Sequence, residues 1–282
     1  RQSFVTVCRN LRELFNIATD KPTILKFKNY FAKYYKSTYL KLTGLIMQGK
    51  IIHADETSLK LRDQLGYVWV FTNMEEVIFI FKPTREGQFL KNFLKNFMGV
   101  LITDFYSAYD SLSCPQQKCL IHLIRDLNDD LYKFPFDNEF KDVVHAFAIL
   151  LQTIVKSIDT YGLKKRHLHK HKKDVEKFFK DITKHSYKSE LANKYKKRLL
   201  KMKIKLFTFL EYDGVPWNNN NAEHAFRHLA LYRKTVRGLL TEEGAEDYLI
   251  LLSIFQTCEY KNINFLQFLL SKKKDIDSFK SK

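Results

Sequence analysis

The sequence predicts an α/β protein with one mixed sheet, and three observations carry that prediction. Three short runs rich in β-branched and aromatic residues lie close together within residues 51–83, which is typical of antiparallel strands. A helix with phenylalanines four residues apart follows them at 86–97. A continuous apolar run at 99–104 then has the character of a strand buried on both faces.

Composition bounds the class of protein. Apolar residues make up 45% of the 282 residues, which is ample for a hydrophobic core. The chain has 48 Lys and Arg against 31 Asp and Glu, a net charge of +17. This excess indicates a polyanionic partner, nucleic acid first and an acidic membrane surface second, although a solvated basic surface is the alternative. The four cysteines form no C-x-x-C pair, which favours a reducing compartment.

No apolar run approaches the roughly 18 residues that a membrane span needs, so we expect no membrane partner. Residues 1–48 predict a helical N-terminal segment, because Phe4, Val7 and Leu11 recur at helical spacing. Asp20 and Pro22 mark a break within it.

Residues 49–136 form the predicted first part of a sheet core. The runs IIHADET, GYVWVFT and EVIFIFKP, at 51–57, 66–72 and 76–83, predict an antiparallel meander. The segment EGQFLKNFLKNF (86–97) predicts an amphipathic helix that ends at Gly99. GVLITD then forms the fourth strand, and KCLIH (118–122) is the predicted fifth strand, running into the helix LIRDLNDDLYK.

This order of elements is that of a ribonuclease-H-like fold. Residues 137–212 predict a basic, all-helical insertion, in which 164–205 holds 17 Lys and Arg and 4 Asp and Glu, or 17 − 4 = +13. Its aromatic residues would form the apolar seam of the helices, with stacking on bases as the alternative. Residues 213–240 complete the core and 241–282 form C-terminal helices.

Two aspartates pose a problem for a buried sheet. Asp55 lies within the apolar first strand, on the same face as His53, and Asp104 ends the fourth strand. A buried acid is costly unless it is paired or binds a cation, and two neighbouring carboxylates are most simply reconciled by a divalent metal. Singly, Asp104 could instead cap the following segment, and Asp55 could pair with a basic residue.

A third acid follows a run of four asparagines in PWNNNNAEHAFRHLALYRKTVRG (216–238). A helix beginning near Asn221 would place Glu223 and Arg227 on one flank of its buried stripe. The alternative is an ordinary ion pair between these two residues. One asparagine can cap the helix, but capping does not explain four.

The motifs HADET, TDFYSAY, CLIHLIRDL and NNNAEHAFRHLALYRKTVRG, followed by TEEGA, occur in this order from about His53 to Leu269. Together they resemble the insertion-sequence-66 family of DDE transposases, which have a ribonuclease-H-like fold and hold two Mg²⁺ ions with two Asp and one Glu. Two positions differ from the family, His224 in place of Arg and Phe105 in place of Gly. Neither position is one of the three acids.

The resemblance implies that Asp55, Asp104 and Glu223 are the catalytic and metal-binding triad, with two Mg²⁺ ions as cofactors for which Mn²⁺ can substitute. It implies cleavage at transposon ends and strand transfer into double-stranded DNA, by a homodimer or larger assembly in the bacterial cytoplasm at the nucleoid. His122 and Arg125 would lie behind the site. The expected DNA-binding residues are Asn219, Asn220, Arg227, Arg233, Lys234, Arg237, Lys164, Lys165, Arg166, Lys172, Lys173, Lys196, Lys197 and Arg198.

Other functions remain open from the sequence. One is a ribonuclease-H-like nuclease or resolvase without strand transfer, and another is a domesticated DNA-binding protein without catalysis. A membrane-surface or scaffold protein fits the charge but leaves the acids unexplained. Cys119 and His122 could bind zinc only with two further ligands. Trp217 could stack on a base or anchor the loop, and His167, His169 and His171 are expected on the surface.

Overall fold

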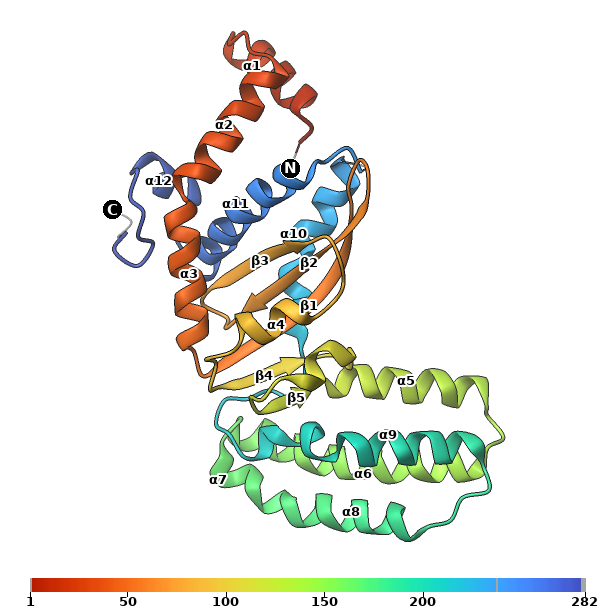
Figure 1. Cartoon of the computed structure of the whole chain (residues 1–282). Coiled ribbons are helices and arrows are strands. Elements are labelled where there is room, and N and C mark those ends of the chain that lie inside the picture. The colour runs from red at the N-terminus through yellow and green to blue at the C-terminus, as the bar shows by residue number, and fades with distance from the viewer. Residues whose placement is uncertain (1, 237, 280–282) are drawn as a thin grey trace. The chain divides into compact units, whose positions relative to one another are not determined.

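The computed structural model describes residues 2–236 and 238–279 (Figure 1). It contains a five-stranded mixed sheet of order β3-β2-β1-β4-β5 with flanking helices, which confirms the predicted α/β class and is consistent with the ribonuclease-H-like prediction. The chain divides into two compact units, Arg1–Phe97 with Asn220–Lys282, and Met98–Asn219. Each unit is described by itself below.

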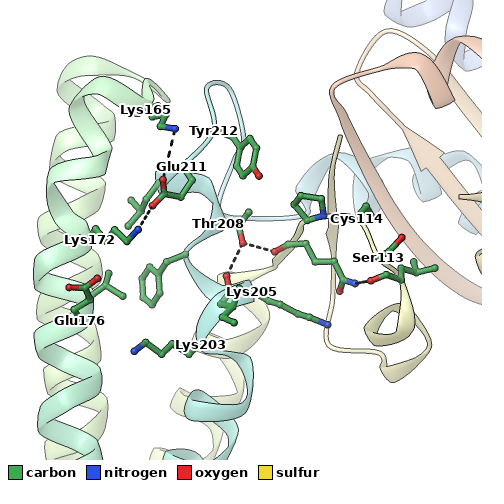
Figure 2. Close-up of a pocket in the computed structure, with 17 residues that line it drawn as sticks. Ser113, Cys114, Lys165, Lys172, Glu176, Lys203, Lys205, Thr208, Glu211 and Tyr212 are labelled. Atoms are coloured by element: carbon green, nitrogen blue, oxygen red, sulfur yellow. Dashed lines mark hydrogen bonds and ion pairs between the residues drawn. The ribbon is translucent and has the colours of Figure 1, made fainter. Parts of the chain in front are cut away.

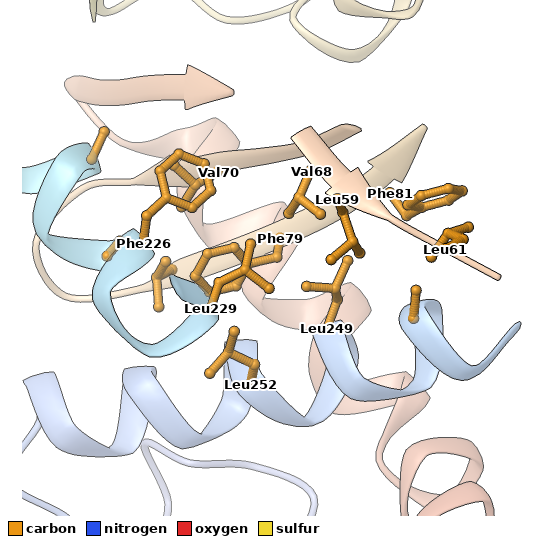
Figure 3. Packing of buried hydrophobic residues seen from close by; sticks show 14 residues of the cluster. Leu59, Leu61, Val68, Val70, Phe79, Phe81, Phe226, Leu229, Leu249 and Leu252 are labelled. Carbon is orange, nitrogen blue, oxygen red and sulfur yellow. The ribbon is translucent and has the colours of Figure 1, made fainter. Parts of the chain in front are cut away.

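The first unit contains the predicted meander, β1 (Ile51–Lys60), β2 (Leu65–Thr72) and β3 (Val77–Lys82). All neighbours in it are antiparallel, and Asp55 pairs with Val70, which in turn pairs with Phe79. Since side chains alternate along a strand, these three residues share one face of the sheet. That face packs on α10 (Asn220–Val236) and α11 (Glu242–Tyr260), as Figure 3 shows for Val70, Phe79, Phe226, Leu229 and Leu252.

The opposite face of the meander carries Trp69 and Phe71. Their rings lie 5.1 Å from Phe89 and 4.7 Å from Phe93, respectively. These two phenylalanines belong to α4 (Gln88–Phe93), which occupies the middle of the predicted helix at 86–97. The spacing of four that predicted this helix therefore also determines which of its residues cover the sheet.

The N-terminal helices are α1 (Phe4–Phe15), α2 (Lys21–Tyr34) and α3 (Lys36–Gln48). The predicted break is the start of α2, where Asp20 accepts a hydrogen bond from the Thr23 N–H and caps the helix. Tyr35 is fully buried, and its ring lies 5.5 Å from that of Phe268 in α12 (Phe265–Leu270).

In the second unit, β4 (Val100–Thr103) runs parallel to β5 (Gln116–Lys118). The fifth strand was predicted at 118–122, and this was wrong. Most of that segment belongs to α5 (Leu120–Lys133), whose Leu120, Leu123 and Leu127 are buried at helical spacing. A short apolar run fits a strand and a helix equally well, and here the helical period is the one that the packing uses.

The remaining helices of this unit are α6 (Asn138–Tyr161), α7 (Lys165–Leu168), α8 (Lys172–Lys184) and α9 (Glu190–Leu206). Phe178, Phe179 and Tyr195 are buried in this unit, as expected of an apolar seam. His171 was predicted on the surface, which was wrong. It is 5% exposed and lies 2.7 Å from Ser157 Oγ, because the 3₁₀ turn before α8 directs it toward α6.

By length and composition alone, α6 is the one helix among the described residues that could cross a membrane. Core helices of soluble proteins pass the same test, and α6 buries residues such as Phe147 and Ile154 in this unit. The finding is weak evidence for a membrane span, and the absence of a membrane partner stays a prediction.

Candidate active site

Two contacts fix α10 on the face of β1 that carries Asp55. Near the start of the helix, Asn221 Nδ2 lies 3.1 Å from Nε2 of the fully buried His53. Further along, Arg233 Nη1 donates to Thr57 Oγ1 at 3.1 Å and to the Ser58 carbonyl at 2.6 Å. His53, Asp55 and Thr57 alternate along one face of the strand, so the contacts bracket Asp55 on both sides.

Glu223 lies in the first turn of the same helix. Ala222, Ala225, Phe226 and Leu229 form the buried stripe of α10, whose packing on the sheet holds the helix in place. Glu223 and Asp55 are both partly exposed. The packing of small residues at the start of α10 thus presents a carboxylate at the edge of a buried stripe.

Asp104 belongs to the other unit and directly follows β4. Its Oδ1 accepts a hydrogen bond from the Tyr106 N–H at 2.9 Å, and its carbonyl accepts one from Thr103 Oγ1 at 2.9 Å. Asp55 is held in a similar way, with Oδ1 accepting from the Glu56 N–H at 2.8 Å. A backbone amide therefore orients one oxygen of each aspartate.

Sequence reasoning missed a buried lysine beside Asp104. Lys118, at the end of β5, is 0% exposed, and its Nζ donates to Thr103 Oγ1 at 3.1 Å. The same nitrogen lies 3.4 Å from Asp110 Oδ1, which also pairs with Lys205 at 3.0 Å. Burial lowers the pKa of Lys118, and the charge of Asp110 opposes that shift. The signal in the sequence was the polar run QQK directly before an apolar segment.

The asparagine run is tied to the beginning of α5. The Asn219 N–H donates to Cys119 Sγ at 3.2 Å, and the Trp217 carbonyl accepts from the Leu120 N–H at 2.9 Å. The Trp217 side chain is partly exposed. Asn219 is fully buried, which does not fit a direct contact with DNA, whereas Asn220 is exposed at the start of α10.

The other predicted DNA-binding residues separate into two groups. Three are partly buried and contact the protein itself: Arg233 as above, Lys196 through the carbonyls of Thr183 and His185, and Arg198 through Asp126. The others that the structure describes have exposed side chains, and they are Lys164, Lys165, Arg166, Lys172, Lys173, Lys197, Arg227 and Lys234. Of these, Lys165, Lys172 and Arg166 have side chains that contact Glu211 or His167. Arg237 lies outside the described residues. His122 is partly exposed and Arg125 exposed, both on α5.

The mixed sheet with its flanking helices is consistent with the ribonuclease-H-like class. A model of the Transposase IS66 family matches residues 7–247, which is most of the chain. The protein therefore belongs to the IS66 family of transposases. No curated protein matches the chain. Family membership implies DNA as the partner and confirms the resemblance seen in the sequence motifs.

Proposed function

We propose that this transposase cleaves phosphodiester bonds at transposon ends and joins the resulting 3′-hydroxyls to target DNA, with Asp55, Asp104 and Glu223 as its catalytic acids. The observation that carries the proposal is the attachment of α10 to β1 on both sides of Asp55. It associates the helix of Glu223 with the strand of Asp55, in a chain of the IS66 family. Asp104 directly follows β4, in the other unit.

The donor chemistry of the three acids fits a divalent metal. All three offer carboxylate oxygens, the ligands that Mg²⁺ and Mn²⁺ prefer, and a backbone amide orients each aspartate. Asp55, Asp104 and Glu223 would together hold two such ions. Such ions, when bound, supply positive charge at the scissile phosphate and activate the attacking water.

The remaining residues of the proposed site bind and position DNA. The exposed Arg227 and Lys234 lie on α10 beyond Glu223 and would contact backbone phosphates. The His53–Asn221 contact would keep the start of α10 against the sheet when Arg227 and Lys234 bind DNA. We further propose that two or more copies act together on paired ends.

Cleavage of a labelled duplex that carries the ends of the encoding element tests this proposal. We expect nicking with Mg²⁺ or Mn²⁺ but not with EDTA. The nicking rate should fall by roughly 10³-fold or more in Asp55→Asn and in Glu223→Gln, because removing one member of a group that acts as a unit costs about as much as removing all of them. Asp63→Asn, an exposed acid just after β1, is the matched control and should cleave normally. Undiminished nicking in EDTA or in Glu223→Gln would contradict the proposal.

A further inference from the structure

The unit Met98–Asn219 contains a pocket of about 750 Å³, within the range of small-ligand sites. Figure 2 shows its lining, which comes from α7, α8, α9 and the segments that follow β4 and α9. Four lysines line it, Lys165, Lys172, Lys203 and Lys205. The acids in the lining are Glu176 and Glu211. The pocket is therefore positive as a whole.

Glu211 lies among three basic groups. Its Oε1 is 3.2 Å from Lys172 Nζ, and its Oε2 is 3.1 Å from His169 Nδ1 and 4.0 Å from Lys165 Nζ. Figure 2 shows the carboxylate between the two lysines. Burial alone would raise the pKa of Glu211, but the hydrogen bond from Lys172 and the surrounding charges hold that pKa below its usual value.

The basic groups come from one stretch of chain and the acid from another. The run KKRHLHKHKK (164–173) has six Lys and Arg, three His and no acid. Glu211 approaches this run from the turn after α9, where it follows the 3₁₀ helix Thr208–Leu210. Within the described part of the chain, Glu211 is the acid that pairs with the lysine side chains of this run, and a third of its side chain is open to solvent.

We propose that this pocket binds one phosphate of the DNA backbone and that Glu211 occupies the phosphate position until DNA displaces it. A carboxylate and a phosphodiester each carry one negative charge and present two oxygens to donors. The two oxygens of Glu211 face Lys172 on one side and Lys165 with His169 on the other, and lysines are among the side chains that contact backbone phosphates. The inference rests on DNA as the partner in the proposed function.

Displacement of Glu211 is physically accessible. Ion pairs between exposed groups contribute only about 0–1 kcal/mol, so a ligand with further contacts outcompetes one carboxylate. DNA brings those contacts, because neighbouring phosphates reach the exposed Lys164 and Arg166 of a second, adjoining pocket that shares Lys165. Lys203 adds a cation inside the first pocket, where its Nζ lies 5.2 Å from the Phe179 ring.

Binding of the full chain to duplex DNA in EDTA, measured by fluorescence anisotropy, tests the inference without any catalysis. Glu211→Gln removes the competing charge and should tighten binding about tenfold, which corresponds to about 1.4 kcal/mol. The matched control is Glu176→Gln, which removes the same charge from the same pocket. Among the described residues Glu176 has no salt-bridge partner, so its substitution should tighten binding far less.

The cations provide the second arm. Lys172→Met should make the negative slope of log K against log salt less steep by about 0.9, the value for one phosphate contact. Lys170→Met, a cation of the same run that lies over the Tyr161 ring instead, should leave the slope unchanged. A third arm replaces DNA with inorganic phosphate as the probe.

Three results would overturn the inference. The first is an equal gain in DNA affinity for Glu211→Gln and Glu176→Gln. The second is an equal slope of log K against log salt for Lys172→Met and Lys170→Met. The third is that Glu211→Gln binds inorganic phosphate more tightly but shows no gain in affinity for DNA. Each of these leaves the proposed function standing as long as the wild type binds DNA. Failure of the wild type to bind duplex DNA even at low salt would contradict both the inference and the proposed function.

Discussion

Single residues around Asp104 show how the fold keeps a charge where water is excluded. Lys118 is fully enclosed, and it is stabilised by Asp110, Thr103 Oγ1 and the face of the Tyr109 ring at 5.6 Å. Burial of an unpaired ammonium would be prohibitive, so these contacts are what permit it. Through Thr103, the lysine also supports the backbone that carries Asp104.

Lys118→Met should destabilise the protein by about 1–3 kcal/mol. Removal of one partner of a buried pair costs more than this when the other charge stays buried, but Asp110 is a quarter exposed and keeps Lys205. Urea denaturation followed by circular dichroism measures the change. Lys194→Met, which removes an exposed lysine paired with Asp130, serves as the control and should change stability by less than about 0.5 kcal/mol. Equal stability of the two variants would rule out a structural role for the buried charge.

Among the elements, α10 serves both the packing and the candidate site, because it carries a buried apolar stripe and Glu223. Its stripe packs on residues such as Val70 and Phe79, while its polar contacts with β1 lie near the two ends of the helix. Apolar packing provides most of the binding energy of a helix to a sheet but is not directional, whereas hydrogen bonds fix position. The two polar contacts therefore fix the position of α10 along β1, and with it the position of Glu223.

Asn221→Ala tests this role of the polar contact. Because the change removes a partner of the fully buried His53, we expect a loss of about 1–3 kcal/mol in the free energy of unfolding. We also expect slower DNA cleavage under conditions in which the variant is fully folded. His224→Ala, on an exposed position of the same helix, is the comparison and should leave stability nearly unchanged. A cleavage rate for folded Asn221→Ala equal to that of the wild type would show that the contact does not position Glu223.

At the scale of the molecule, charge and candidate chemistry are distributed differently along the chain. Of the net +17, +13 (17 − 4) lies within residues 164–205, all in the unit Met98–Asn219. Asp55 and Glu223 belong to the other unit, and Asp104 to the basic one. The distribution suits an enzyme that uses one region chiefly to hold a polyanion and another to act on it.

Much of this organisation could be predicted from the sequence, because periodicity reports which face of an element is buried. The alternation of β-branched and aromatic residues located β1, β2 and β3, and phenylalanine spacing located α4. Three features escaped prediction for a common reason: the strand Gln116–Lys118 is polar, His171 is buried, and Glu211 meets a basic run about 40 residues upstream. Each depends on a partner distant in sequence, and a local pattern carries no information about that partner.

The same limit applies to the candidate site. The motifs identified Asp55, Asp104 and Glu223 by resemblance, but not the contacts that hold their elements. Asn221 reaches His53 across 168 residues, and Arg233 reaches Thr57 across 176. Arg233 and Lys196 were expected to bind DNA, and the structure gives each of them hydrogen bonds to protein carbonyls, so their contact with DNA stays a prediction. Charge alone does not distinguish a ligand contact from an internal one.

The joining of a pre-nicked transposon end to a target duplex tests the central claim most directly. With a free 3′-hydroxyl supplied, a transposase needs no first cleavage step and should form a joined product in Mg²⁺ with the wild type. The product should be absent with Glu223→Gln and retained with Asp63→Asn. Cleavage of intact ends without any joined product, or joining that survives Glu223→Gln, would contradict the account.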